Sequence, residues 1–368
     1  MESILRTAAG LLDTELSDPT DLGGSGRSTV LRCRSADGRS VIVKAYVNEP
    51  DGLRSFASEA AGLSLRLAGP ELLAVDLAVP LLVMEDLGKA PTLADVLLAD
   101  DPDAATEGLL TWARSLGRLA AGSAGRHADL MRLRSRYDKG VPSREGEAWI
   151  GKGATGLLAL LDAAELPVPA GLAGELEDIG SAVGSDPVGF TPGDTCPDNN
   201  LLTPDGLRLI DFESACFQSV FLTAAYCRMP FSTCWCVFRL PPGMAERIEH
   251  AFRAEVVTAY PELADDAIWQ AGVHRAIAAW TMDITVLLLP RCLPADMPMH
   301  RTRRPAPTMR QLLAYRWETA RTLAELPAFA ATMDLLLREV AETWDLPPLP
   351  GYPAFTEAGE GQGSRPRS

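Results

Sequence analysis

Three polar residues at a fixed spacing are the first sign of chemistry in this chain. Asp194 and Asn199 lie five positions apart, and Asp211 ends a short apolar run that follows them. The intervening sequence TPDG (203–206) has the composition of a turn that joins two strands of a hairpin. Phosphoryl transfer uses such a set, because one carboxylate orients the attacking hydroxyl while an amide and a second carboxylate hold Mg²⁺ on the phosphates.

Length and composition exclude several classes of protein. A chain of 368 residues suits two lobes or domains better than one small core. Its 47% hydrophobic and 23% charged residues are typical of a soluble globular protein. The formal net charge of −15 argues against a nucleic-acid partner. That charge would steer a cationic substrate toward the protein, although solubility is the simpler explanation for it.

The cysteines and the apolar segments give an expectation about the compartment. Seven cysteines, an odd number without metal-ligand spacing, predict reduced thiols rather than a disulfide framework. Cys234 and Cys236 form a lone Cys-x-Cys, which does not indicate zinc. The first residues lack the basic and apolar regions of a signal peptide, and the longest apolar run, Ile277–Leu289, contains Asp283 and is too short to span a bilayer. We therefore expect a cytoplasmic protein without a membrane partner.

The N-terminal part has the pattern of strands around a glycine-rich turn. Gly24, Ser25 and Gly26 precede a strand of alternating character, and Lys44 lies near the end of the strand that returns from it. Taken alone, such a turn and such a lysine are commonplace. A helical segment with Glu59 on its first turns follows. A strand lysine followed by a helix glutamate is the pair that fixes a phosphate-binding ammonium in a nucleotide site.

A change of composition marks a boundary near residue 88. An apolar strand over 79–85 leads into a polar link that ends in Gly88, and residues 92–122 are rich in Ala and Leu with helical periodicity. We predict a β-rich N-terminal lobe over residues 1–87 and a larger helical lobe over residues 88–350. Pro, Gly and Ser dominate the end of the chain and predict a disordered tail over residues 351–368.

In this order, the motifs resemble those of the aminoglycoside phosphotransferase and choline kinase-like family, over roughly residues 20–290. The resemblance implies an α+β, two-lobed protein kinase-like fold that binds ATP and Mg²⁺ and transfers the γ-phosphate to a substrate hydroxyl. It implies that Asp194 accepts the proton of that hydroxyl. It also implies that Asn199 and Asp211 are the Mg²⁺ ligands, since hard oxygen donors suit this ion.

The same resemblance assigns the nucleotide contacts. Lys44 is expected to hold the α- and β-phosphates, and Glu59 to orient Lys44. The glycine-rich turn is expected to cover the phosphates, and the end of the apolar strand to hold the adenine. The residues expected to cover the phosphates are Gly24, Ser25 and Gly26. The residues expected to contact the adenine are Met84, Glu85 and Leu87.

Three positions depart from the family pattern or leave it open. Pro192 stands where the family usually has a His, which is generally a structural prop of the loop rather than the chemical base. Glu213 replaces the Gly of the protein-kinase motif, and is either a further metal or substrate contact or a salt-bridged loop carboxylate. Asn200, next to Asn199, offers a second register for the amide ligand, although the five-residue spacing from Asp194 favours Asn199.

The resemblance places the acceptor after residue 215, where several residues are candidates. The aromatic and sulfur-rich segment over residues 226–236 is best explained as a buried core, and the alternative is that Trp235 or Arg228 forms a wall of the acceptor pocket. Four acidic residues are potential partners of substrate ammonium groups: Asp265, Asp266, Asp283 and Asp296. Scattered acidic residues of this kind are more often surface caps. Asp283 is the exception, because an Asp within an apolar helix is expected to have a protein or ligand partner.

The leading acceptor class is an aminoglycoside or related antibiotic. The alternatives are a metabolic alcohol, such as a sugar, choline-like or amino-alcohol compound, and a nucleotide-binding pseudokinase without transfer activity, which Pro192 alone favours.

Overall fold

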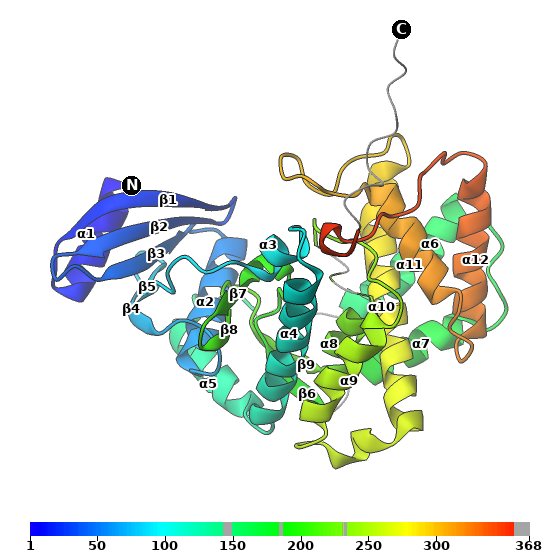
Figure 1. The fold of residues 1–368 in the computed structure, drawn as a ribbon, viewed down its shortest axis with the longest axis horizontal. Coiled ribbons are helices and arrows are strands. Elements are labelled where there is room, and N and C mark those ends of the chain that lie inside the picture. Colours follow the sequence, from blue (N-terminus) through cyan, green and yellow to red (C-terminus); the bar gives the residue numbers. More distant parts are fainter. Residues whose placement is uncertain (143–148, 184–186, 230, 232–233, 357–368) are drawn as a thin grey trace, which may run out of the picture.

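A computed structural model describes residues 1–142, 149–183, 187–229, 231 and 234–356. The described chain folds into a small β-rich lobe and a larger helical lobe (Figure 1). The small lobe holds a five-stranded antiparallel sheet in the order β1-β2-β3-β5-β4. Its elements are α1 (Glu2–Leu12), β1 (Leu16–Ser25), β2 (Ser28–Ser35), β3 (Ser40–Tyr46), α2 (Pro50–Ser64), β4 (Leu72–Asp76) and β5 (Leu81–Glu85).

Strand alternation decides which β3 side chains reach the cleft. Val41, Val43 and Ala45 pack with Ala8 of α1 in a separate apolar cluster on one face of the sheet. Because successive side chains point to opposite faces of a strand, Lys44 projects from the other face, toward α2 and the large lobe. The alternating pattern of this strand therefore places one lysine in a nearly dry site at the junction of the lobes.

The polar link between the lobes is fixed by Asp86. Its carboxylate accepts hydrogen bonds from Arg32 Nη2 on β2 (2.9 Å), from Ser40 Oγ on β3 (2.6 Å) and from the backbone N–H of Gly88 (3.0 Å). These contacts hold the link against the sheet, so the end of β5 and the start of the large lobe keep one relative position. Although burial opposes ionisation, the hydrogen bonds outweigh it and lower the pKa of Asp86.

Replacing Asp86 by Asn is expected to destabilise the protein at neutral pH by about 2 kcal/mol, the range for hydrogen bonds to a charged group. Because the pKa of Asp86 is lowered on folding, its stabilisation is complete above the usual Asp pKa of 3.8 and is lost as the pH falls through the lowered value. Denaturant unfolding of both proteins at neutral and acidic pH measures this difference. If the difference in unfolding free energy between the native chain and Asp86→Asn does not decrease at acidic pH, the charge of Asp86 has no stabilising role.

The large lobe is built from helices around a long central helix, α10. The remaining helices are α3 (Leu93–Leu97), α4 (Pro102–Gly122), α5 (His127–Tyr137), α6 (Trp149–Ala163), α7 (Leu172–Val183), α8 (Val220–Arg228), α9 (Met244–Val256), α10 (Asp266–Cys292), α11 (Met309–Ala320) and α12 (Pro327–Ala341). Three 3₁₀ turns cover Pro197–Asn199, Pro261–Ala264 and Pro353–Phe355. Two hairpin-like strand pairs lie at the lobe junction: β6 (Val188–Thr191) with β9 (Cys216–Ser219), and β7 (Asn200–Thr203) with β8 (Gly206–Leu209).

Helix α10 is long and apolar enough to cross a membrane by length and composition alone. In the fold, however, 67% of the most apolar 18-residue stretch of this helix is buried inside the protein. Helices α6, α8 and α11 pack on it. Trp269 and Met282 on this helix are fully buried. The apolar sequence of α10 is therefore that of a core helix.

The predicted α+β, two-lobed architecture is confirmed, with β5 ending at Glu85 and the first helix of the large lobe beginning at Leu93. The predicted tail is wrong over residues 351–356. Tyr352 is fully buried and its hydroxyl donates to the carbonyl of Cys236 (3.0 Å), so this stretch belongs to the core of the large lobe. The rest of the predicted tail lies outside the described residues.

Candidate active site

Lys44 is the centre of a buried charge cluster at the lobe junction. Its Nζ lies 2.6 Å from Glu59 Oε2 of α2 and 2.7 Å from Asp211 Oδ1. Burial disfavours the ammonium, but the two carboxylates outweigh burial and raise the pKa of Lys44. The predicted Lys44–Glu59 pair is thus present, and Asp211 completes a three-residue cluster.

Glu59 is itself held in place from three sides. Besides Lys44, it accepts hydrogen bonds from the hydroxyl of Tyr46 and from the backbone N–H of Phe212 (3.3 Å). Its side chain is 2% exposed. This residue therefore links β3, α2 and the segment after β8, which makes it a positioning group for both Lys44 and Asp211.

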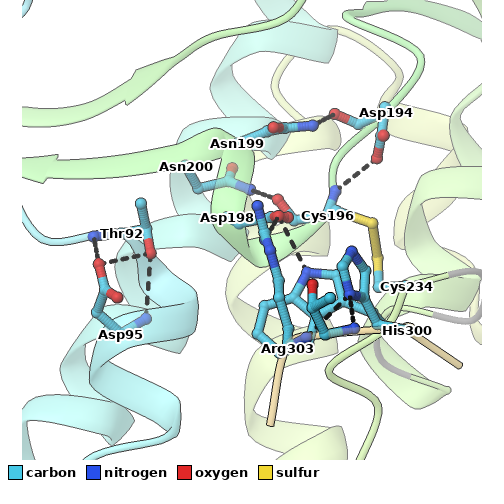
Figure 2. Close-up of polar contacts among 12 residues, drawn as sticks. Thr92, Asp95, Asp194, Cys196, Asp198, Asn199, Asn200, Cys234, His300 and Arg303 are labelled. Carbon is cyan, nitrogen blue, oxygen red and sulfur yellow. Dashed lines mark hydrogen bonds and ion pairs between the residues drawn. A yellow bond between two sulfur atoms is a disulfide. The ribbon is translucent and has the colours of Figure 1, made fainter. Parts of the chain in front are cut away.

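The loop after β6 carries Asp194 into the cleft (Figure 2). Gly193 has a φ of +89°, and a Cβ there would lie 2.3 Å from the carbonyl oxygen of Ser214, so only glycine fits this turn. The carboxylate of Asp194 accepts from the N–H of Cys196 (3.0 Å). Burial, together with the charges of Asp211 and Asp198, raises the pKa of Asp194.

The two neighbouring asparagines have different surroundings. Asn199 lines the cleft, and its Nδ2 donates to the backbone carbonyl of Asp194 (3.4 Å), which leaves the amide oxygen as its acceptor. Asn200 is fully buried, and its Nδ2 donates to the carbonyls of Thr195 (3.2 Å) and Cys196. Asn200 therefore supports the loop from inside, whereas Asn199 faces the cleft (Figure 2).

The β7–β8 hairpin brings Asp211 next to Asn199. The N–H of Ile210 donates to the carbonyl of Asn199 (3.0 Å), so the two ends of the hairpin are adjacent. Asp211 has a φ of 64°, a backbone conformation that is sparsely populated outside glycine and is concentrated at functional sites. One amide oxygen and one carboxylate from adjacent backbone segments form a donor set that fits a hard divalent cation.

Glu213 pairs with Arg27 of the glycine-rich turn between β1 and β2. The pair joins the two lobes across the mouth of the cleft. Burial and the nearby charge of Asp211 raise the pKa of Glu213, despite the attraction of Lys44 and Arg27. Of the two roles considered for Glu213, the salt-bridged carboxylate is the one present in this structure.

A cleft of about 910 Å³ lies between the lobes and collects most of the predicted site. Its lining includes the residues expected to contact a nucleotide and a metal, which are Gly24, Ser25, Lys44, Glu59, Met84, Glu85, Leu87, Asn199 and Asp211, and it also includes Asp194. Gly26, at the tip of the turn, lies outside this lining. Residues from five separate stretches of the chain therefore converge on one cavity.

Pro192 is buried at the start of the loop. Next to it, the N–H of Gly193 donates to the hydroxyl of Thr191 (3.1 Å). Thr191 and the buried Asn200 thus hold the loop from its two ends. The sequence reasoning did not single out Thr191, although a hydroxyl next to the glycine of a tight turn is a recognisable signal.

A disulfide joins Cys196 of this loop to Cys234. The prediction of reduced thiols throughout is therefore wrong for this pair, while the other five cysteines form no disulfide. The pairing links two loops that are 38 residues apart, and nothing in their local sequence indicates that they meet. The Asp194 carboxylate lies within 4.8 Å of both sulfurs, but sulfurs bonded to each other do not act as thiolate ligands.

Reduction of this disulfide is expected to destabilise the protein by up to about 4 kcal/mol, the loop-entropy value for a closed segment of this length. Thermal unfolding with and without a thiol reductant measures the effect. The double variant Cys196→Ser, Cys234→Ser serves as the control, because its unfolding should not respond to reductant. If the oxidised and reduced native chains unfold at the same temperature, the disulfide does not stabilise the protein.

On the side expected to hold the acceptor, the cleft is lined by Trp235, Asp198, Met299, His300 and Arg303. Trp235 Nε1 donates to Asp198 (3.0 Å), and Arg303 pairs with the same carboxylate. Trp235 lines the cleft, as in the alternative that the sequence left open beside a buried core. His300 and Arg303 were not considered, because they lie in a loop between two helices without periodic pattern.

The other acceptor candidates have structural roles. Arg228 is bound by Glu249, Gln270 (2.6 Å) and His274 (2.9 Å), and does not line the cleft. Asp265 caps α10, Asp266 pairs with Arg253, and Asp296 accepts from the N–H groups of Met297 and Arg310. Asp283 lies half-buried on α10, where burial raises the pKa of its carboxyl, outside the lining of the cleft.

Fold and site together define a two-lobed α+β architecture with a charged cleft at the lobe junction. No family model matches the chain, and no curated protein matches it in sequence.

Solved structures resemble it at low identity. A choline/ethanolamine kinase family protein from Mesorhizobium loti is 16% identical over 87% of this chain and 92% of its own, with a TM-score of 0.48. The macrolide 2'-phosphotransferase MphH from Brachybacterium faecium is 16% identical over 79% and 92%, with a TM-score of 0.48. The streptomycin–ATP–APH(2")-IIa complex is 11% identical over 78% and 90%, with a TM-score of 0.47.

Proposed function

We propose that this chain is an ATP- and Mg²⁺-dependent small-molecule kinase that transfers the γ-phosphate to a substrate hydroxyl. The observation that supports the proposal best is the convergence of Lys44, Glu59 and Asp211 in contact at the lobe junction, with Asp194 in the same cleft. An ion pair of this kind serves to fix an ammonium for phosphate binding. The presence of this ion pair favours a catalytically active kinase over a protein that uses the cleft only for binding.

The chain's own residues would act by positioning and by charge. Lys44, held by Glu59, binds the α- and β-phosphates, and Gly24 and Ser25 cover them with backbone N–H groups. The Met84–Leu87 stretch contacts the adenine. Asn199 and Asp211 would hold Mg²⁺, which neutralises the phosphate charge when bound.

Asp194 performs the proton chemistry in this proposal. It accepts the proton of the acceptor hydroxyl as the oxygen attacks the γ-phosphorus, while the bond from that phosphorus to the β–γ bridging oxygen breaks and ADP leaves. The raised pKa of its carboxyl makes it a better base than an ordinary aspartate. No covalent intermediate with the enzyme is needed, because the two substrates meet directly in the cleft.

A mass-shift screen tests the function. The purified protein is incubated with ATP, Mg²⁺ and a panel of aminoglycosides, macrolides, sugars and amino alcohols, and each acceptor is examined for the added mass of one phosphoryl group. Nucleotide binding is measured in parallel, with and without Mg²⁺. Nucleotide binding without any phosphorylated acceptor would favour the pseudokinase, and the absence of nucleotide binding would refute both.

A further inference from the structure

The loop between α10 and α11 concentrates basic side chains at the acceptor end of the cleft. His300, Arg301, Arg303 and Arg304 lie within five residues, in a chain whose net charge is −15. The loop, gold in Figure 1, is closed at its base by the pairing of Pro298 with Thr308. Two backbone hydrogen bonds of 2.8 Å, from Met299 to Pro307 and from Met309 to Met297, secure that closure. The basic tip is therefore positioned by the fold.

Arg303 is oriented by two contacts with the opposite wall (Figure 2). Its guanidinium carbon lies 4.9 Å from the centre of the Trp235 ring, and its Nη1 pairs with Asp198. The indole N–H of Trp235 also donates to Asp198, so the three side chains form one unit. Within the described part of the chain, no protein group accepts from Nε or Nη2 of Arg303. The planar guanidinium group of Arg303 thus lines the cleft with N–H groups that have no protein acceptor among the described residues.

The carboxylates at this end are already engaged. Asp198 is neutralised by Arg303, and Asp95 accepts from the backbone N–H and the hydroxyl of Thr92 in a helix cap. Among the described lining residues at this end, that leaves Asp194, which the proposed reaction uses as a base. A polycation needs several free carboxylates to replace its lost hydration. This end of the cleft does not supply them.

We propose that Arg303 selects the acceptor, and that the acceptor is a hydroxyl compound bearing a carboxylate rather than a polycationic aminoglycoside. This rests on the proposed kinase function. Arg303 binds the carboxylate through its free N–H groups, a geometry that suits a planar anion. Trp235 and Met299 face an apolar part of the molecule. A monoanionic carboxylate fits better than a dianionic phosphate, because Asp194 and Asp211 lie in the same cleft and would repel the second negative charge.

A matched series of benzyl alcohols tests the charge preference directly. The probes are 4-(hydroxymethyl)benzoate, its neutral carboxamide and the corresponding benzylamine, with streptomycin as the polycation. Binding is measured calorimetrically on the full chain loaded with Mg²⁺ and a non-hydrolysable ATP analogue, and transfer is measured separately by mass shift with ATP. We expect the carboxylate to bind roughly 10- to 100-fold more tightly than the amine, the range for hydrogen bonds to charged groups.

Variants identify the residue responsible. Arg303→Gln should remove the preference for the carboxylate, and Arg303→Lys should restore it only in part because the planar fork is lost. Arg338→Gln on α12 removes an equal charge from an exposed site outside the cleft and should change nothing. Thermal unfolding of each variant verifies that it is folded.

The outcomes separate this proposal from the proposed function. It is overturned if the amine or streptomycin binds more tightly than the carboxylate, if the carboxylate does not bind at millimolar concentration, or if Arg303→Gln leaves the order unchanged. It is also overturned if Arg303→Gln weakens nucleotide binding instead, because Arg303 would then serve the phosphates. A carboxylate preference without phosphorylation of any acceptor would refute the kinase while supporting the specificity of the site. Phosphorylation of streptomycin without a preference for the carboxylate would support the kinase and refute the proposed specificity.

Discussion

Asp194→Ala is expected to lower the rate of phosphoryl transfer by roughly 10²- to 10⁴-fold, the usual contribution of a positioned base. The affinity for Mg²⁺–nucleotide should not fall, because Asp194 lies toward the acceptor end of the cleft and repels the phosphates rather than binding them. Steady-state kinetics with the acceptor found in the screen, together with calorimetric titration of the nucleotide, measures both quantities. The variant thus separates chemistry from binding.

The matched control for this variant is Asp205→Ala, which removes an exposed aspartate from the turn between β7 and β8, outside the cleft. It should keep full turnover. Equal turnover by Asp194→Ala would disprove the role of Asp194 as the base. Asp194→Asn is a useful second variant, because it keeps the side-chain volume and an acceptor for the N–H of Cys196 while it removes the charge.

The convergence of Lys44, Glu59 and Asp211 could be predicted from sequence because these residues lie on or next to regular elements. Strand alternation fixes the face from which Lys44 projects, and helical spacing places Glu59 on the buried side of α2. A tight turn fixes the register of the hairpin that carries Asn199 and Asp211. In each case a local pattern decides where the side chain points, so the order of the motifs along the chain was enough to expect that they converge.

The acceptor half depends on contacts between irregular loops. Cys196 meets Cys234, and Asp198 meets Arg303 from 105 positions away. Loop-to-loop contacts carry no periodicity, so the sequence offers no signal for them. The composition of the end of the chain also led to a wrong prediction. The segment over residues 351–356 is rich in Pro and Gly, but the buried Tyr352 anchors it to the large lobe.

The capping role of Asp265, which the sequence favours over substrate binding, is confirmed. Asp265 directly precedes a helical pattern, which is the usual position of an N-cap, and the structure shows it accepting from the N–H groups of Ala267 and Ile268. The sequence therefore contained the reason to set this residue aside as a substrate contact. Arg228 is different, because its partners Glu249 and His274 lie on other helices and only the fold brings them together.

Glu59→Gln is expected to destabilise the protein by about 3 kcal/mol, because breaking a buried ion pair leaves an uncompensated charge. Lys44 would keep Asp211 as its remaining partner, which places the loss at the lower end of the range for such pairs. Denaturant unfolding measures the change. Glu71→Gln is the matched control, since Glu71 is an exposed glutamate 3.6 Å from Arg66 and its loss should cost less than about 1 kcal/mol.

The double variant Glu59→Gln, Lys44→Met tests the cause of that destabilisation. If the cost comes from the buried ammonium left without its partner, then removing that ammonium as well should recover part of the lost stability. Nucleotide affinity should not recover, because the phosphates lose their cation. Additive losses of stability in the double variant would contradict the coupling between Lys44 and Glu59. A double variant that binds nucleotide as well as the native chain would remove Lys44 from the proposed phosphate site.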